Sequence, residues 1–181
     1  MAYSSILKPS LYMNTKLYTG DGAASHAITG VGFQPDLCWV KKRSSPATDH
    51  NLNTSVNLGS GTASQYVLTS NSAELLQDNG STYFQSLDSD GFTIGNSDKV
   101  NANSANFASW NWKAGTAVSG STTGSGTAKT YTGSVNTTSG FSIIKYVGNG
   151  TAGHTIPHHL GAAPQMIIVK ALSTNDDWMV G

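Results

Sequence analysis

The chain of 181 residues is long enough to bury a hydrophobic core, as one large domain or two small ones. Ser, Thr, Asn and Gly account for 78 residues, charged residues make up only 11%, and Glu occurs once, at Glu74; this composition favours strands and turns over helices. Ten basic and ten acidic residues cancel, so no net charge draws the protein to nucleic acid or an acidic membrane, and we expect neither as a partner.

The N-terminal segment MAYSSILKPS has no basic region followed by a long apolar stretch, and nothing in it approaches a membrane span. We therefore expect a soluble chain that is made in the cytoplasm of its host cell and, if exported, leaves by a route such as cell lysis.

Two predicted strands flank the Gly-Asp-Gly segment at residues 20–22. Glycine and aspartate tolerate the positive φ of tight turns, so this segment predicts a hairpin. Pro35 then precedes an apolar run over residues 37–41. Proline is tolerated at the start of a strand, and the run predicts a buried strand in which the single cysteine, Cys38, is a small core residue.

The middle of the chain contains three further predicted strands, at residues 65–68, 83–87 and 107–112. Between them, residues 72–78 have the spacing of a short helix. The segment 89–94 (SDGFTI) predicts a turn that ends at Gly91 and starts a strand with Phe92 on one of its faces. Residues 138–143 (TSGFSI) repeat this pattern.

An internal repeat relates the two ends of the chain. The shared positions are Tyr18, Gly20, Gly22, His26, Ile28, Pro35 and the run 37–41 in the first copy, and Tyr146, Gly148, Gly150, His154, Ile156, Pro164 and the run 166–170 in the second. The order and spacing agree with one inserted residue near His159. We therefore expect the second copy to reuse the hairpin and the buried strand of the first.

Residues 115–130, GTAVSGSTTGSGTAKT, lie between the copies and have no periodic apolar positions, so we interpret them as a linker. The predicted organisation is a β-sandwich module over residues 1–114, this linker, and an incomplete second module over 131–181. Short strands separated by turns predict an all-β antiparallel sandwich or jelly roll. The second module would be either a truncated repeat or one completed by another chain.

The titratable residues do not form a recognisable active site or metal site. His154 aligns with His26, whereas His158 and His159 have no counterparts, so a structural hydrogen bond at a turn is favoured over a metal site. The segment 88–91 (DSDG) lacks the later acidic ligands of a calcium loop. Glycosidases need two facing carboxyl groups, and Glu74 has no evident partner. We expect no catalytic residues, no metal and no cofactor.

Trp110 and Trp112 lie two residues apart, so they point to the same face of a strand together with Ala108. Packing in the core is one interpretation, because a small sandwich needs large inward-facing residues. Stacking on sugar rings is the alternative. The basic run 41–43 (KKR) is interpreted as a solvated strand end.

Four segments resemble a β-rich module found, often in tandem, in tail-fibre and other structural proteins of marine and cyanobacterial tailed phages. They are residues 32–44 (GFQPDLCWVKKRS), 86–95 (SLDSDGFTIG), 108–115 (ASWNWKAG) and 159–170 (HLGAAPQMIIVK). The resemblance implies a lectin-like sandwich on the virion surface, in a fibre or a capsid decoration. We expect other virion proteins and copies of the chain itself, arranged as a trimer, as partners, with host surface glycans as a further candidate.

The resulting expectation is a non-enzymatic structural protein of a virion, in the particle-proximal part of a tail fibre or similar appendage involved in host attachment. A capsid decoration or cement protein is one alternative. A carbohydrate-binding module that uses Trp110 and Trp112 is another. The repeat-defining residues Gly20, Gly22, His26, Pro35, Trp39, Gly91, Phe92, Gly148, Gly150, His154 and Pro164 are expected to have structural roles.

Overall fold

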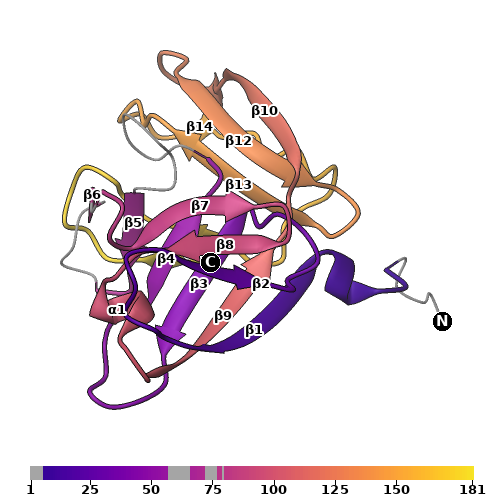
Figure 1. Ribbon diagram of the computed structural model, residues 1–181. Coiled ribbons are helices and arrows are strands. Elements are labelled where there is room, and N and C mark those ends of the chain that lie inside the picture. The colour runs from indigo at the N-terminus through magenta and orange to yellow at the C-terminus, as the bar shows by residue number, and fades with distance from the viewer. Residues whose placement is uncertain (1–5, 57–65, 72–76, 79) are drawn as a thin grey trace.

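The computed structural model describes residues 6–56, 66–71, 77–78 and 80–181 (Figure 1). Over these residues the fold is an all-β antiparallel sandwich, as the sequence predicts. Helical structure in the described part is confined to the 3-10 turn η1 (Pro9–Leu11) and to α1 (Asp98–Asn101). Within the same residues, no helix has the length and apolar character needed to cross a membrane.

The large sheet has six strands in the order β1-β9-β3-β4-β5-β6, and the small sheet has three in the order β2-β8-β7. The large sheet contains β1 (Met13–Thr19), β9 (Asn106–Trp112), β3 (Leu37–Lys42), β4 (Asn51–Thr54), β5 (Tyr66–Thr69) and β6 (Gln77–Asp78). The small sheet contains β2 (His26–Thr29), β8 (Gly91–Ile94) and β7 (Phe84–Asp88). Figure 1 shows the small sheet crossing in front of the large one.

The main hydrophobic core lies between these two sheets. Cys38 and Val40 from β3, Phe107 from β9, and Phe84 and Phe92 from the small sheet are all completely buried in one cluster. Side chains alternate between the two faces of a strand, so Cys38, Val40 and Phe107 point from β3 and β9 into this core. The residues between them point to the opposite face of the large sheet. The prediction of Cys38 as a core residue is confirmed.

Most of the predicted strands are confirmed, with shifted ends. The strands predicted at 37–41, 83–87 and 107–112 are β3, β7 and β9, and the one at 65–68 overlaps β5, with Gln65 outside the described residues. The helix predicted over 72–78 is wrong where it can be checked, because residues 77–78 form β6; residues 72–76 lie outside the described part.

The Gly-Asp-Gly segment at residues 20–22 does not form the predicted hairpin. It connects β1, which pairs with β9, to β2, which pairs with β8, and so carries the chain from the large sheet to the small one. The glycines indicate a turn but not which strands pair after it. The predicted turn before Gly91 does close a hairpin, in which Asp88 of β7 lies opposite Gly91 of β8.

Residues 115–130 are not the linker that the sequence suggests. They contain β10 (Thr116–Ser121), which pairs along its whole length with β12 (Thr130–Asn136), and β12 pairs in turn with β13 (Phe141–Tyr146). The short strand β11 (Thr123–Gly124) pairs with β14 (His154–Thr155). Backbone pairing stabilises this polar segment, and apolar periodicity does not reveal such pairing.

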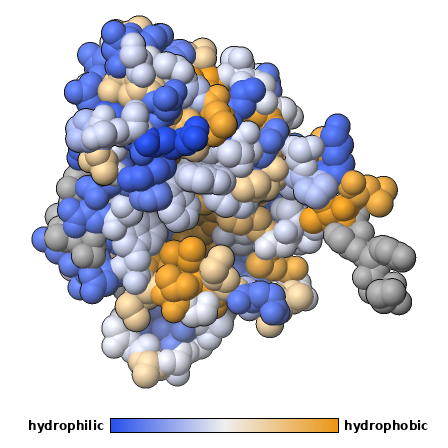
Figure 2. Space-filling view, turned by 90° about the horizontal axis from the view of Figure 1, so that it is seen from below, coloured by the Kyte–Doolittle hydropathy of each residue, from blue (hydrophilic) through white to orange (hydrophobic). Residues whose placement is uncertain are grey.

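The buried strand expected over residues 166–170 is also corrected. Only Ile168–Val169 form a strand, β15, which pairs with β16 (Met179–Val180). Met166 is 65% exposed and Ile167 is 51% exposed. On the face seen in Figure 2, hydrophobic residues gather in compact patches between polar ones.

The C-terminal half packs on the face of the large sheet that points away from the main core. Leu52 and Leu68 form a second buried cluster there, against which Trp39, Leu172 and Trp178 pack. The indole Nε1 of Trp178 also donates a hydrogen bond to the backbone oxygen of Thr69, at 3.1 Å. The large sheet is therefore covered, at least in part, on both faces.

A buried carboxylate joins the two halves. Asp36, just before β3, is 8% exposed. Its side chain accepts hydrogen bonds from the backbone nitrogen of Ala114 at 2.8 Å and from the hydroxyls of Ser134 at 3.0 Å and Ser55 at 2.5 Å. Ser134 lies on β12 and in addition accepts a hydrogen bond from Gly115 N at 3.0 Å. The carboxylate therefore fixes the point where the chain enters the second half.

Replacing Asp36 with alanine should lower the free energy of unfolding by about 3 kcal/mol, because it leaves two buried donors, Ala114 N and the Ser134 hydroxyl, and the partly buried Ser55 hydroxyl without their charged acceptor. Urea denaturation followed by circular dichroism measures this change. Asp177→Ala, at an exposed position, is the matched control and should stay within about 0.5 kcal/mol of the wild type. Equal effects of the two variants would contradict the role assigned to Asp36.

Candidate functional site

Three tryptophans cluster on the outer face of the large sheet. Trp39 lies directly opposite Trp110 across β3 and β9, with ring centroids 6.4 Å apart, and its centroid is also 6.4 Å from that of Trp112. All three side chains are partly buried. The prediction that Trp110 and Trp112 share a face is confirmed, and this face lies opposite the main core.

The two predicted tryptophans differ in their position relative to a cavity of about 230 Å³. Trp112 lines it together with Tyr12, Met13 and Phe141, whereas Trp110 does not. The rings of Trp112 and Phe141 stack with centroids 6.2 Å apart and an interplanar angle of 24°. Flat aromatic walls of this kind suit the apolar face of a sugar ring or another planar group.

Trp39 is engaged within the protein. Its Nε1 donates a hydrogen bond to Nδ1 of His50 at 2.7 Å. Burial, and secondly the charge of Lys41, lower the pKa of His50, which favours the neutral imidazole that can accept this bond. The Trp39 indole nitrogen is thus an internal contact and is not positioned to bind a ligand.

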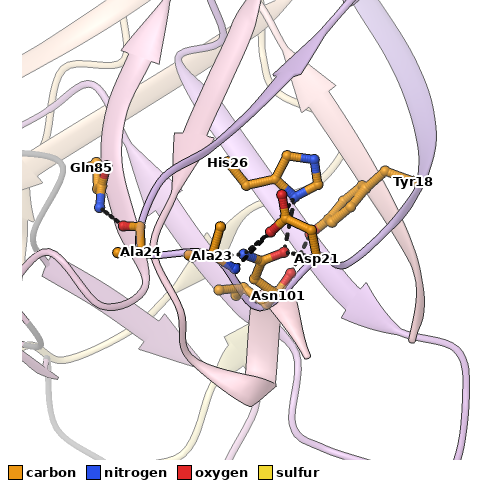
Figure 3. Close-up of polar contacts among 8 residues, drawn as sticks. Tyr18, Asp21, Ala23, Ala24, His26, Gln85 and Asn101 are labelled. Carbon is orange, nitrogen blue, oxygen red and sulfur yellow. Dashed lines mark hydrogen bonds and ion pairs between the residues drawn. The ribbon is translucent and has the colours of Figure 1, made fainter. Parts of the chain in front are cut away.

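His26 and the turn at residues 20–22, two features of the first copy of the repeat, meet Asn101 in a polar cluster (Figure 3). Nδ1 of His26 lies 2.9 Å from Oδ1 of Asn101, which also accepts a hydrogen bond from Asp21 N at 3.0 Å. Nδ2 of Asn101 donates to the Asp21 carboxylate at 2.9 Å. Asn101 is fully buried, so this amide is the hub of the cluster.

The Asp21 carboxylate accepts a further hydrogen bond from Ala23 N at 2.8 Å. This bond is the main reason why the pKa of Asp21 is lowered, followed by the bond from Asn101. His26 Nδ1 is 3.4 Å from the same carboxylate but is already engaged by Asn101. The arrangement holds the turn in place, as expected for a structural histidine. Sequence reasoning missed Asn101, because nothing distinguishes it from the other asparagines.

Tyr18 completes this region from β1. Its ring stacks on Phe107, its cross-strand neighbour, with centroids 5.1 Å apart, and its hydroxyl donates to the backbone oxygen of Val100 at 2.8 Å. Burial raises the pKa of Tyr18. The hydroxyl therefore remains protonated at neutral pH and acts as a hydrogen-bond donor.

The second copy preserves part of this arrangement. Asn149 accepts a hydrogen bond from Thr151 N at 3.0 Å, as Asp21 does from Ala23 N. His154, the counterpart of His26, bonds through Nε2 to the Thr122 hydroxyl at 2.5 Å. Gly22 and Gly150 have φ of +68° and +72°, so both turns need a residue that tolerates this conformation.

The other two histidines of the second copy have separate partners. His158 Nδ1 accepts a hydrogen bond from Leu160 N at 3.2 Å, and His159 Nε2 lies 2.8 Å from the Tyr131 hydroxyl. Over the described ranges, no group of three metal-binding side chains comes together. The remaining candidate for acid–base chemistry, Glu74, lies outside the described residues.

The basic run at residues 41–43 differs from the solvated strand end that we expected. Lys41 Nζ donates to the backbone oxygen of Thr48, and Lys42 is only 7% exposed. The ammonium group of Lys41 is therefore held by the fold, and Lys42 is buried. Among the other repeat-defining residues, Pro35, Gly91 and Phe92 are buried, whereas Pro164 is partly buried.

Gly20 and its repeat counterpart Gly148 offer a direct test of how far the copies are equivalent. A Cβ at Gly20 would lie 2.3 Å from the backbone oxygen of Ala102, whereas one at Gly148 would meet nothing within 4 Å. Gly20→Ala should therefore lower the free energy of unfolding by about 3 kcal/mol. Gly148→Ala should change it by less than about 0.5 kcal/mol. Thermal and urea denaturation would measure both, and similar losses would refute the asymmetry.

Comparison with known proteins adds one match. A family model described as "Domain of unknown function (DUF7483)" matches residues 8–181. No curated protein and no solved structure matches the chain. The matched range includes the large sheet, the tryptophan face and the strands after residue 115. The chain therefore belongs to the DUF7483 family, and the family's model extends over both of its halves.

Proposed function

We propose that this protein is a non-enzymatic structural component of a tailed-phage virion, in the particle-proximal part of a tail fibre or similar appendage involved in host attachment. The four sequence segments that resemble phage structural modules support the virion assignment. The antiparallel β-fold agrees with the sandwich that the resemblance implies. The polar contacts of His26 and Asp21 serve a turn, which suits a scaffold better than a catalytic site.

The observation that carries the proposal is the fixed junction between the two halves. The Asp36 side chain accepts hydrogen bonds from Ala114, at the end of the first half, and from Ser134, on β12 of the second half. In addition, the ring of Trp112 stacks on that of Phe141. A junction held by a buried carboxylate and by ring stacking resists bending, because several contacts must break together. An appendage that transmits force between the particle and its host needs such a stiff junction.

On this proposal the partners are other virion proteins and further copies of this chain, arranged as a trimer. The protein would be made in the host cytoplasm and released with the particle by lysis. A capsid decoration protein would share these properties and differ only in its position on the particle.

Purified particles of the phage that encodes this chain provide the test. Mass spectrometry should detect the chain at a stoichiometry well above contaminants, and cryo-electron microscopy should place its density on the tail appendage. Density on the head would favour the decoration protein. The absence of the chain from purified particles would reject the virion assignment.

Carbohydrate binding is a second candidate, favoured by the cavity between Tyr12, Trp112 and Phe141. Glycan-array binding should be lost in Trp112→Ala and in Tyr12→Ala while the far-ultraviolet circular dichroism is retained, because each change removes an aromatic wall. Tyr146→Ala, an exposed aromatic residue outside the cavity, is the control and should keep the signal. A signal that survives both cavity variants would exclude this site.

A further inference from the structure

A second cavity, of about 460 Å³, lies beside the junction of the two halves. Its walls come from three segments of the chain: the β2–β3 loop, the turn between β7 and β8, and the connection from β9 to β10. It shares no lining residue with the cavity beside Trp112. Its volume is in the range of small-molecule sites, so it is a separate candidate for ligand binding.

Hydrogen bonds between the β2–β3 loop and the β7–β8 hairpin hold two of these walls together. The Asp90 carboxylate accepts hydrogen bonds from Gly30 N at 2.9 Å and from Gly32 N at 2.6 Å. Nε2 of Gln34 donates to the backbone oxygen of Leu87 at 2.9 Å. The walls are therefore fixed before a ligand enters, which reduces the entropy lost on binding.

The cavity contains a carboxylate that can accept one more hydrogen bond. Asp36 lines the cavity, although it is only 8% exposed. An ionised carboxylate has about four acceptor positions. Ser55 and Ser134 donate to its Oδ1, and Ala114 N donates to its Oδ2. The described residues thus leave one acceptor position on Oδ2 for a ligand that donates a hydrogen bond.

Lys113 brings the opposite charge to the same cavity. Its side chain is half-buried, and its stem passes Gly115, where an added Cβ would lie 3.7 Å from Lys113 Cε. Among the described residues, the ammonium group of Lys113 has no hydrogen-bond or ion-pair partner. Its N–H groups can therefore donate to a ligand.

These groups favour an uncharged ligand with several hydroxyls. A ligand carboxylate would be attracted to Lys113 but repelled by Asp36, and a ligand amine would meet the reverse. Because a sugar hydroxyl both donates and accepts, one hydroxyl can donate to Asp36 while another accepts from Lys113. The Gln34 amide and the Ser89 hydroxyl add further donors and acceptors. Phe33 is only 4% exposed, so ring stacking contributes little here.

We propose that this cavity binds an uncharged polyol, namely one hexose residue, through Asp36, Lys113 and the polar groups around them. The occupant would contact two loops of the first half and the connection to the second half, and so would add contacts at the junction. The inference does not depend on the virion assignment. It is also independent of sugar binding beside Trp112, because the two cavities have no lining residue in common.

Nuclear magnetic resonance of the isotope-labelled full chain, titrated with D-glucose, D-galactose and D-mannose in turn, is the test. At least one hexose should shift the amide signals of Gly32, Ser89 and Gly115 saturably. Glucosamine and glucuronate, which carry one charge each, should bind at least about threefold more weakly than that hexose, because each is repelled by one of the two charged groups.

Lys113→Met keeps most of the stem and removes the charge. It should weaken hexose binding about fivefold or more and make glucosamine the preferred ligand, because the charge of Asp36 is then unbalanced. A residue that only supported the fold would not change the order of the ligands. Lys8→Met, at an exposed position outside the cavity, is the matched control and should change neither the affinity nor the order. Amide spectra of both variants check that they fold.

Ser89→Ala removes one exposed hydroxyl from the wall and should weaken hexose binding about twofold. The proposal would be overturned by the absence of a saturable shift with all three hexoses, or by shifts confined to the cavity beside Trp112. Equal hexose affinity of Lys113→Met, Ser89→Ala and the wild type would also overturn it. Tighter binding of glucuronate or glucosamine than of any hexose by the wild type would assign the cavity to a charged ligand instead.

Discussion

The arrangement of this protein depends on a buried carboxylate, Asp36, for which the described residues supply hydrogen-bond donors and no basic side chain. Asp36 is stabilised by three donors, from Ser55 within the first half, Ala114 at the end of it and Ser134 on β12. Its backbone takes part as well, since Asp36 N donates to Trp112 O at 2.7 Å and Asp36 O accepts from Ser55 N at 2.9 Å. Hydrogen-bond donors, rather than a salt bridge, therefore stabilise the Asp36 carboxylate. These donors come from segments that are far apart in the sequence.

The two faces of the large sheet differ in how completely they are covered. One face is covered by the main hydrophobic core, which contains Phe84, Phe92 and Phe107. The other carries Trp39, Trp110 and Trp112, which are only partly covered by the second half. Large amphipathic rings suit such a half-covered surface, because they pack against apolar neighbours and tolerate contact with water. A single surface thus provides both the attachment of the second half and the cavity beside Trp112.

The sequence predicted local structure well and long-range pairing poorly. Apolar runs and the alternation of apolar with polar residues identified β3, β7 and β9, because a strand with a buried face has apolar residues at the positions that point to that face. Pairing is specified by backbone geometry instead, so the turn at residues 20–22 was assigned to a hairpin and β10 was missed in a polar segment. Trp110 and Trp112 were correctly placed on one face. Asn101 and Asp36 could not be identified in advance, since their importance depends on neighbours from remote segments.

The central position of β9 has a consequence for synthesis on the ribosome. Met13 of β1 and Leu37 of β3 both pair with Trp112, so the large sheet closes only when nearly the whole first half has emerged. Until then β1 has no described neighbour, and β3 has only β4. Contacts this distant in sequence slow folding and leave edges open to wrong partners in the meantime. The nascent chain is therefore most vulnerable to aggregation in the interval before residue 112 leaves the exit tunnel.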